Sequence, residues 1–333
     1  MKLKTLRMLI RPIVGVFFLF FLIRYSMLDL NQIKLMLISK WTILGFPCII
    51  ISFFIFSIRW KVLLYSVGLN LRYSEIARLT FIGIAFNTII PGGVGGDIVK
   101  TYYLTRDMRY KSKAISTVIL NRIVGLFSAL IVSLCAIFGV LTFGKGMIQS
   151  IVEIRNLQIL GLVIIIMITL LIIGFIITMS DRFRQTGIVQ WITTKAPGYE
   201  IIKKLYDALY EFKHKTYTLF LTTIISIIGQ FPLILSFYFF GRSFENVLSF
   251  AHYLFLAPIA FFLNAIPLGP GGLGTGEAFV YALFKLCGSM NGANINAVFH
   301  IAIIIIGIFC YFLFIIGNKD RVNIYNTGQN IEK

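Results

Sequence analysis

Charged residues are scarce in this sequence of 333 residues. They make up 13% of it, and only 13 residues are Asp or Glu, against 31 Lys and Arg. Because soluble globular domains contain about 25% charged residues, this composition excludes an ordinary soluble domain. The hydrophobic share is 58% and the mean hydropathy is +0.88, values typical of an integral membrane protein.

Cysteine and histidine are also rare, with 4 and 3 residues. The cysteines lie in or beside apolar segments, without CxxC spacing and without a neighbouring His. We therefore expect buried thiols, and neither a disulfide, a metal site nor a cofactor. The four positions are Cys48, Cys135, Cys287 and Cys310.

Signatures of catalysis are missing as well. The sequence contains no P-loop, no HExxH and no GxSxG motif, and no DxD pair that would hold the metal of a sugar nucleotide. The first outer loop contains a single carboxylate, Asp29, so no acid and base pair is positioned there. The sequence predicts no catalytic residues and favours a protein that is not an enzyme.

Long apolar runs recur along the chain. They approach the roughly 20 residues that cross about 30 Å of hydrocarbon as a helix, and they lack the alternation of a barrel strand, so we expect an all-α polytopic membrane protein. The first run lies close to a basic N-terminus but is followed by no small-residue cleavage site, and we interpret it as an uncleaved span. The runs cover Ile13–Ile23, Ile43–Ile58, Ile159–Met179, Leu219–Phe240 and Ile295–Ile316.

The basic residues are distributed unevenly between the predicted loops. Loops on one side of the membrane contain 23 Lys and Arg, and loops on the other side contain 7. The positive-inside rule then places both termini and the 180–215 loop in the cytoplasm, in a protein of the cytoplasmic membrane. The net charge of +18 therefore indicates topology and attraction to anionic lipid, and no nucleic-acid partner is expected.

One glycine-rich motif occurs twice. It reads Pro91-Gly92-Gly93-Val94-Gly95-Gly96-Asp97 in the first copy and Pro270-Gly271-Gly272-Leu273-Gly274-Thr275-Gly276-Glu277 in the second. Each copy follows an apolar stretch with one asparagine, Asn87 or Asn264. Helix breaks at membrane depth are tolerated where protein buries them or where they line a wet cavity. Two matching breaks therefore predict a transporter-like binding site.

The segment before the first motif is too short to cross the membrane. Residues 79–90 would span about 18 Å as a helix, and basic residues flank the segment and the motif on both sides. We predict a re-entrant hairpin that enters from the cytoplasm and turns at residues 91–96. A second hairpin, built from residues 250–288, opens from the outside; a full crossing there is the alternative.

The order of segments repeats with inverted sense. Pro91 and Pro270 are 179 residues apart, as are Asn121 and His300. We predict one integral membrane domain, 1–333, with a first repeat in 1–142 and a second in 143–333, joined by a cytoplasmic amphipathic linker at 180–215. This inverted-topology repeat has about six full spans and two hairpins, or about eight membrane segments. The spans are 12–24, 42–58, 114–142, 157–179, 216–240 and 295–317.

The glycine amides at the start of the helix after each break would attract an anion. The carboxylates Asp97 and Glu277 have two interpretations. They cap their own helices, or they face a polar groove and meet a cationic headgroup, a proton or Arg122.

Arg122 lies within an apolar span, where an arginine requires a partner. We expect Asp97, Glu277 or a lipid phosphate, and snorkelling to the interface is the alternative. Arg59 and Trp60 are expected to anchor the second span at the interface. The predicted substrate-binding residues are Asn87, Pro91, Gly92, Gly93, Gly95, Gly96, Asp97, Arg122, Asn264, Pro270, Gly271, Gly272, Gly274 and Glu277, with Lys100, Asn121 and His300 as weaker candidates.

The two hairpins, together with Arg59-Trp60 and Asn121-Arg122-Ile123-Val124-Gly125, resemble the flippase-like family that includes the transmembrane region of lysylphosphatidylglycerol synthase. The likeness covers nearly the whole chain, and it includes the PGGxGGD and PGGxGxxE patterns of that family. An acidic residue commonly precedes the intramembrane arginine in the family, whereas this chain has Asn121. The resemblance implies movement of lipids between leaflets. The aminoacyl-transferase domain of the synthase has no counterpart here, so lipid aminoacylation is not expected.

Three functions follow from these observations. The leading hypothesis is a flippase or transporter for an anionic, aminoacylated or glycosylated lipid, whose partner is a membrane lipid with a phosphate-bearing headgroup. The alternative is a polyprenyl-linked glycosyl or lipid-headgroup transferase, or its membrane subunit. A lipid-modifying enzyme is a candidate partner, and a non-catalytic scaffold is the third hypothesis.

Overall fold

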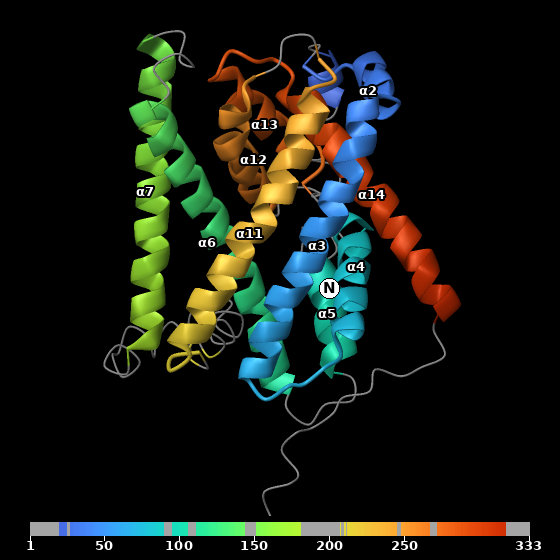
Figure 1. Ribbon diagram of the computed structural model, residues 1–333, viewed down its shortest axis with the longest axis vertical. Helices are drawn as coiled ribbons and strands as arrows, with labels where there is room; N and C mark the ends of the chain where they lie inside the picture. Colours follow the sequence, from blue (N-terminus) through green and yellow to red (C-terminus); the bar gives the residue numbers. More distant parts are fainter. Residues whose placement is uncertain are drawn as a thin grey trace, which may run out of the picture.

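The regular secondary structure of the described residues is helical, as predicted (Figure 1). The computed structural model describes residues 20–24, 27–89, 95–105, 111–143, 151–180, 207, 210, 212–244, 248–266 and 272–317. Most of the predicted linker at 180–215, residues 12–19 of the first predicted span and the extreme ends of the chain lie outside this part.

Five long helices contain stretches that are long and apolar enough to cross a membrane. Their lengths of 26 to 33 residues correspond to roughly 39–50 Å at helical rise. The prediction of a polytopic helical membrane protein is thus confirmed. These helices are α3 (Lys40–Ser66), α6 (Lys111–Phe143), α7 (Ile151–Met179), α11 (Thr216–Gly241) and α14 (Gly292–Gly317).

Two pairs of short helices flank the glycine breaks. The first pair is α4 (Tyr73–Ile89) and α5 (Gly95–Thr105), and the second is α12 (Phe250–Asn264) and α13 (Thr275–Lys285). The two members of each pair pack against each other. In Figure 1 the first pair lies in the lower half of the bundle and the second in the upper half. The short helices predicted around each glycine motif are therefore present.

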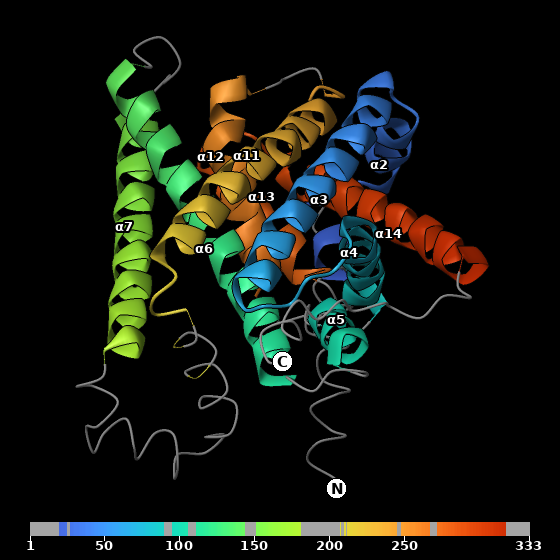
Figure 2. The same cartoon turned by 60° about the horizontal axis from the view of Figure 1, so that its bottom comes forward.

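The same order of helices, one long, two short and one long, occurs twice along the chain, as α3 to α6 and as α11 to α14. Contacts between the two sets are reciprocal: α3 packs against α11, α4 against α14, and α12 against α6. In both views α7 stands at one edge of the bundle beside α6 (Figure 2). The walls of the central region are therefore built from both sets of helices.

Glycines allow α3 and α11 to approach closely. A Cβ atom added at Gly45 would overlap the Phe240 ring, and one added at Gly229 would overlap the Phe56 ring. Small residues at helix crossings let membrane helices pack through their backbones. These two glycines therefore fix the crossing that holds the two sets of helices together.

Two local features differ from the predictions. The helix α3 continues through Arg59 to Ser66, although the second span was expected to end at residue 58, because the apolar residues after Lys61 keep the helix packed against the protein. A further helix, α2 (Leu30–Leu37), occupies the predicted outer loop 24–41. It is capped by the Asp29 side chain, which accepts hydrogen bonds from the N–H groups of Asn31 and Gln32.

Candidate functional site

A cavity of about 290 Å³ lies between the two pairs of short helices. Polar side chains from five helices line it, and they belong to both sets. The polar members are Asn87, Asp97, Asn121, Arg122, Asn264 and His300, and the rest of the wall is formed by Phe53, Ile84, Leu233, Phe261, Ala265, Phe299 and Ile303. The structure therefore brings the predicted Asn87, Asp97, Arg122 and Asn264 together around one cavity.

Arg122 and Asp97 form an ion pair on the cavity wall. Nη1 of Arg122 lies 2.9 Å from Oδ2 of Asp97, and each side chain is 27% exposed. Nη2 of Arg122 donates a hydrogen bond of 2.9 Å to the backbone carbonyl of Ala265, at the C-terminal end of α12, where carbonyls lack partners within the helix. The Arg122 guanidinium therefore bonds a residue of each short pair.

Glu277 and His300 form a second pair, which is more deeply buried. Oε1 of Glu277 lies 2.6 Å from Nδ1 of His300, and the two residues are 1% and 5% exposed. The other carboxylate oxygen accepts a hydrogen bond of 2.6 Å from the N–H of Gly274. Glu277 thus caps α13 and holds His300 at the same time. His300 lines the cavity and Glu277 lies behind it.

The two asparagines hold the helix ends around the glycine breaks. Oδ1 of Asn87 accepts a hydrogen bond of 2.7 Å from the N–H of Gly96. Asn264 and Asn296 exchange two hydrogen bonds, of 2.8 and 3.3 Å. Since both amides are engaged within the protein, their first role is to fix the geometry of the cavity.

The glycines are placed where other residues would not fit. A Cβ at Gly96 would overlap the Gly83 carbonyl, and one at Gly276 would overlap the Asn264 side chain. Gly272 and Gly274 have φ angles of +84° and +80°, a backbone region that glycine adopts without strain. Gly95 and Gly96 begin α5. The predicted residues Pro91, Gly92, Gly93, Pro270 and Gly271 lie outside the described residues.

A buried arginine supports the wall of the cavity from behind. Arg59 is 5% exposed; its Nε donates to Oδ1 of Asn121 at 2.9 Å and its Nη1 to Oγ of Ser226 at 2.6 Å. The expectation that Arg59 and Trp60 anchor α3 at the interface is wrong, because both side chains are buried. The apolar Val62-Leu63-Leu64 segment that follows them was the signal that the helix continues.

Lys100 is also buried, at 9% exposure. Its ammonium group lies over the Trp60 ring, 5.2 Å from the centroid, in a cation–π contact. Lys100 is not among the residues that line the cavity. Lys100 and Arg59 therefore place two positive charges behind the part of the cavity wall that Asn121 and Arg122 form.

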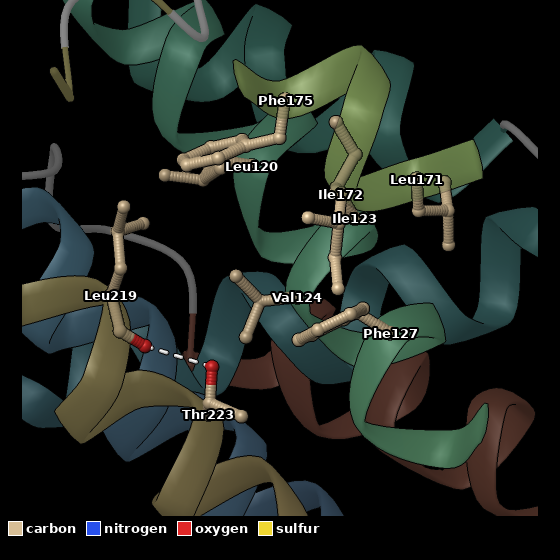
Figure 3. Close-up of a pocket in the computed structure, with 9 residues that line it drawn as sticks. All are labelled: Leu120, Ile123, Val124, Phe127, Leu171, Ile172, Phe175, Leu219 and Thr223. Atoms are coloured by element: carbon tan, nitrogen blue, oxygen red, sulfur yellow. Dashed lines mark hydrogen bonds between the residues drawn. The ribbon is translucent and has the colours of Figure 1, made fainter. Parts of the chain in front are cut away.

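Two apolar pockets lie at the sides of the bundle. A cleft of about 140 Å³ between α6, α7 and α11 is lined by aliphatic and aromatic side chains, with Thr223 bonded to the Leu219 carbonyl (Figure 3). A groove of about 730 Å³ lies between α3, α4 and α14. Phe54, Phe81 and Ile305 line this groove, one turn or less from Phe53, Ile84 and Ile303 of the cavity. The groove and the cavity therefore share the same three helices.

Comparison with known proteins agrees with the resemblance seen in the sequence. The family model described as "Lysylphosphatidylglycerol synthase TM region" matches residues 8–317. The chain belongs to this family.

Two archaeal relatives share part of this sequence. The UPF0104 membrane protein PH1989 of Pyrococcus horikoshii is 25% identical over 297 residues, which cover 83% of this chain and 86% of the relative. The UPF0104 membrane protein MJ1595 of Methanocaldococcus jannaschii is 31% identical over 128 residues, which cover 37% of this chain and 38% of the relative. No solved structure matches the chain significantly.

Proposed function

We propose that this protein moves an anionic lipid between the leaflets of the membrane, with the headgroup in the cavity and the acyl chains in the bilayer. The observation that supports this proposal most is the cavity itself, which places Arg122, Asp97 and His300 inside a bundle of apolar helices. Charged side chains at membrane depth cost at least about 2.5 kcal/mol each on insertion scales. A polar lipid headgroup that binds in the cavity would offset this cost.

The proposed membrane arrangement is an inverted repeat, with 1–142 and 143–333 as its halves. The α4–α5 pair would enter from the cytoplasm and the α12–α13 pair from the outside, with both termini and the 180–215 linker in the cytoplasm. The reciprocal packing of α4 on α14 and α12 on α6 supports this arrangement. Repeats of this kind allow alternating access to a site near the midplane.

The chemistry of the cavity suits a phosphate-bearing headgroup. The Arg122 guanidinium has a planar set of donors that matches phosphate oxygens. The helix α5 begins at Gly95, directly after the glycine break, and the N-terminal end of a helix favours an anion. Asp97 would receive the amine of an aminoacylated headgroup or the hydroxyl groups of a glycosylated one.

The acyl chains have a route beside the cavity. The groove between α3, α4 and α14 is almost wholly apolar and shares its helices with the cavity. Arg78, Tyr73 and Ser74 line it near the start of α4. A lipid could then keep its chains in the groove while its headgroup occupies the cavity.

The test is lipid exchange in reconstituted vesicles. The purified protein would be placed in phosphatidylcholine vesicles containing fluorescent phosphatidylglycerol, phosphatidylcholine or a glycolipid, and dithionite would report the label in the outer leaflet. We expect faster loss of the label for anionic lipid than in protein-free vesicles. No acceleration for any of these lipids would contradict the proposal, and a chemically altered lipid in mass spectra would indicate the transferase alternative.

A variant tests the site within the same assay. Arg122→Ala removes the guanidinium that bonds Asp97 and Ala265, and we expect at least a tenfold loss of exchange, since a hydrogen bond to a charged group contributes about 1.5–3 kcal/mol. Arg155→Ala on α7, an exposed arginine outside the cavity, is the matched control. Equal rates of lipid exchange for the two variants would contradict the assignment of Arg122 to the binding site.

A further inference from the structure

Each set of helices contains one carboxylate paired with one basic side chain, but the two basic side chains differ in chemistry. Asp97 on α5 pairs with Arg122 on α6, 25 residues later, and Glu277 on α13 pairs with His300 on α14, 23 residues later. Arginine keeps its proton in proteins. Histidine is the side chain that exchanges a proton near neutral pH. The second pair therefore contains a base that can take up a proton near neutral pH, and the basic member of the first pair does not.

The hydrogen bonds around Glu277 define which ring nitrogen of His300 exchanges the proton. One carboxylate oxygen lies 2.6 Å from Nδ1 of His300 and the other accepts the N–H of Gly274, and an ionised carboxylate can only accept hydrogen bonds. The Nδ1 atom then holds a hydrogen, which leaves Nε2 as the basic atom of the ring. Because His300 lines the cavity and Glu277 does not, a proton reaches the pair from the cavity.

Three charged or titratable side chains of the described residues share the surroundings of His300: Glu277 from α13 contacts its ring, and Asp97 from α5 and Arg122 from α6 line the same cavity. The other helices present apolar or amide side chains, namely Phe53 from α3, Ile84 and Asn87 from α4, Leu233 from α11, and Phe261 and Asn264 from α12. Asp97 and Arg122 balance each other. A proton on Nε2 therefore adds one positive charge to the wall that an anion would meet.

We infer that Nε2 of His300 is a proton-binding site, and that the proton and an anionic headgroup occupy the cavity together. This inference rests on the proposed function and names its coupling ion. On protonation a new N–H bond forms at Nε2, the imidazole becomes an imidazolium, and Glu277 stays ionised to form an ion pair with it. By linkage, the proton strengthens anion binding by the same factor by which the anion strengthens proton binding. An anionic lipid and a proton then cross in the same direction.

The experiment measures proton uptake on anion binding, without any lipid movement. The probe is glycerophosphoglycerol, a phosphodiester that stays a monoanion near neutral pH, and it would be titrated calorimetrically into the purified full chain in detergent. Repeating the titration in buffers of different ionisation enthalpy gives the number of protons taken up per anion bound. We expect a net proton uptake of at most one per anion bound, which passes through a maximum as the pH is varied, and tighter binding as the pH falls.

Matched histidine variants make the result specific. His300→Asn keeps an N–H donor near the place of Nδ1 and removes Nε2, so we expect it to bind the probe without proton uptake. His252→Asn is the control, because His252 is equally buried and its Nδ1 bonds Ser249 at 2.7 Å, but it does not line the cavity. It should take up protons as the wild type does.

Binding without proton uptake in the wild type, or equal uptake in His300→Asn, would overturn the inference. The measurement on the wild-type protein tests the inference even if a variant fails to fold. Proton-linked binding without lipid exchange in vesicles would contradict only the proposed function. Lipid exchange that is independent of pH, with no proton uptake in the calorimeter, would contradict only the inference.

Discussion

The Arg122 side chain donates a hydrogen bond to the Ala265 carbonyl, which is 143 residues away along the chain. The same guanidinium pairs with Asp97, so one side chain connects the α4–α5 pair to the end of α12. The carbonyl end of a helix bears a partial negative charge, which favours this contact. Any movement that separates the two pairs of short helices must break either this hydrogen bond or the ion pair with Asp97.

Arg122→Lys tests whether positive charge alone is sufficient. A lysine could pair with Asp97, but its compact ammonium group has no planar fork to reach Ala265 at the same time. We expect lipid exchange in vesicles to fall about tenfold, as the loss of about 1.4 kcal/mol implies. Arg155→Lys is the control, and unchanged exchange in Arg122→Lys would show that the Ala265 contact is dispensable.

Gly96→Ala should destabilise the protein. The added Cβ would overlap the Gly83 carbonyl, and it would lie 2.9 Å from Oδ1 of Asn87, the acceptor of the Gly96 N–H. Overpacking of this kind costs about 1–3 kcal/mol, which thermal unfolding in detergent would detect. Gly139→Ala, where no atom lies within 4 Å of the added Cβ, should melt like the wild type. Equal melting of both variants would contradict the packing of α4 on α5.

Asn121→Leu should also destabilise the protein, for a different reason. Its Oδ1 accepts the hydrogen bond from Nε of the buried Arg59, and loss of that acceptor leaves a buried donor unpaired, at a cost of about 1–3 kcal/mol. Asn121→Asp keeps an acceptor and adds a counter-charge, so it should retain the stability of the wild type. A stable Asn121→Leu variant would show that Arg59 finds another partner.

Ser74→Trp should obstruct the proposed path of the acyl chains. Ser74 is exposed and lines the groove between α3, α4 and α14, so a large side chain there would occupy the groove with little effect on packing. We expect slower lipid exchange but unchanged binding of glycerophosphoglycerol, since the cavity is untouched. Val163→Trp, an exposed site on α7 outside the groove, should exchange lipid normally. Similar rates for the two variants would contradict this route.

Cysteine labelling would test the orientation in the membrane. Ile38 lies beside the start of α3 and Tyr65 near its end, and both side chains are exposed. In a chain without its native cysteines, Ile38→Cys should react with an impermeant maleimide added to intact cells. Tyr65→Cys should react only after the membrane is permeabilised. The opposite pattern would invert the proposed topology.

The sequence predicted much of the fold, because apolar length and helix breaks are local properties. The positions of α4 and α5 follow from the glycines at 91–96 and the short apolar segment before them. The high cost of an isolated arginine at that depth predicted a partner for Arg122, with Asp97, Glu277 and a lipid phosphate as candidates, and the structure pairs it with Asp97. These inferences need no knowledge of how the helices rotate about their axes.

The remaining contacts depend on helix rotation and register, which the sequence does not state. Arg59 was expected at the interface, and the structure buries it beside Asn121 because α3 crosses α11 at Gly45 and Gly229. His300 was a weak candidate, since a lone histidine in a membrane helix usually packs against its neighbours. Its distance of 2.6 Å from Glu277 depends on how α13 turns back onto α14. The functional roles of these residues stay predictions.

The packing of α4 on α14 has a consequence for synthesis of the chain. About 200 residues separate the end of α4 from the start of α14, which a ribosome adds in roughly 10 to 40 s at usual rates. During that interval α4 is in the membrane without the helix that packs against it. We therefore expect the newly made first half to depend on the insertion machinery, or on a chaperone within the membrane, until the last helix arrives.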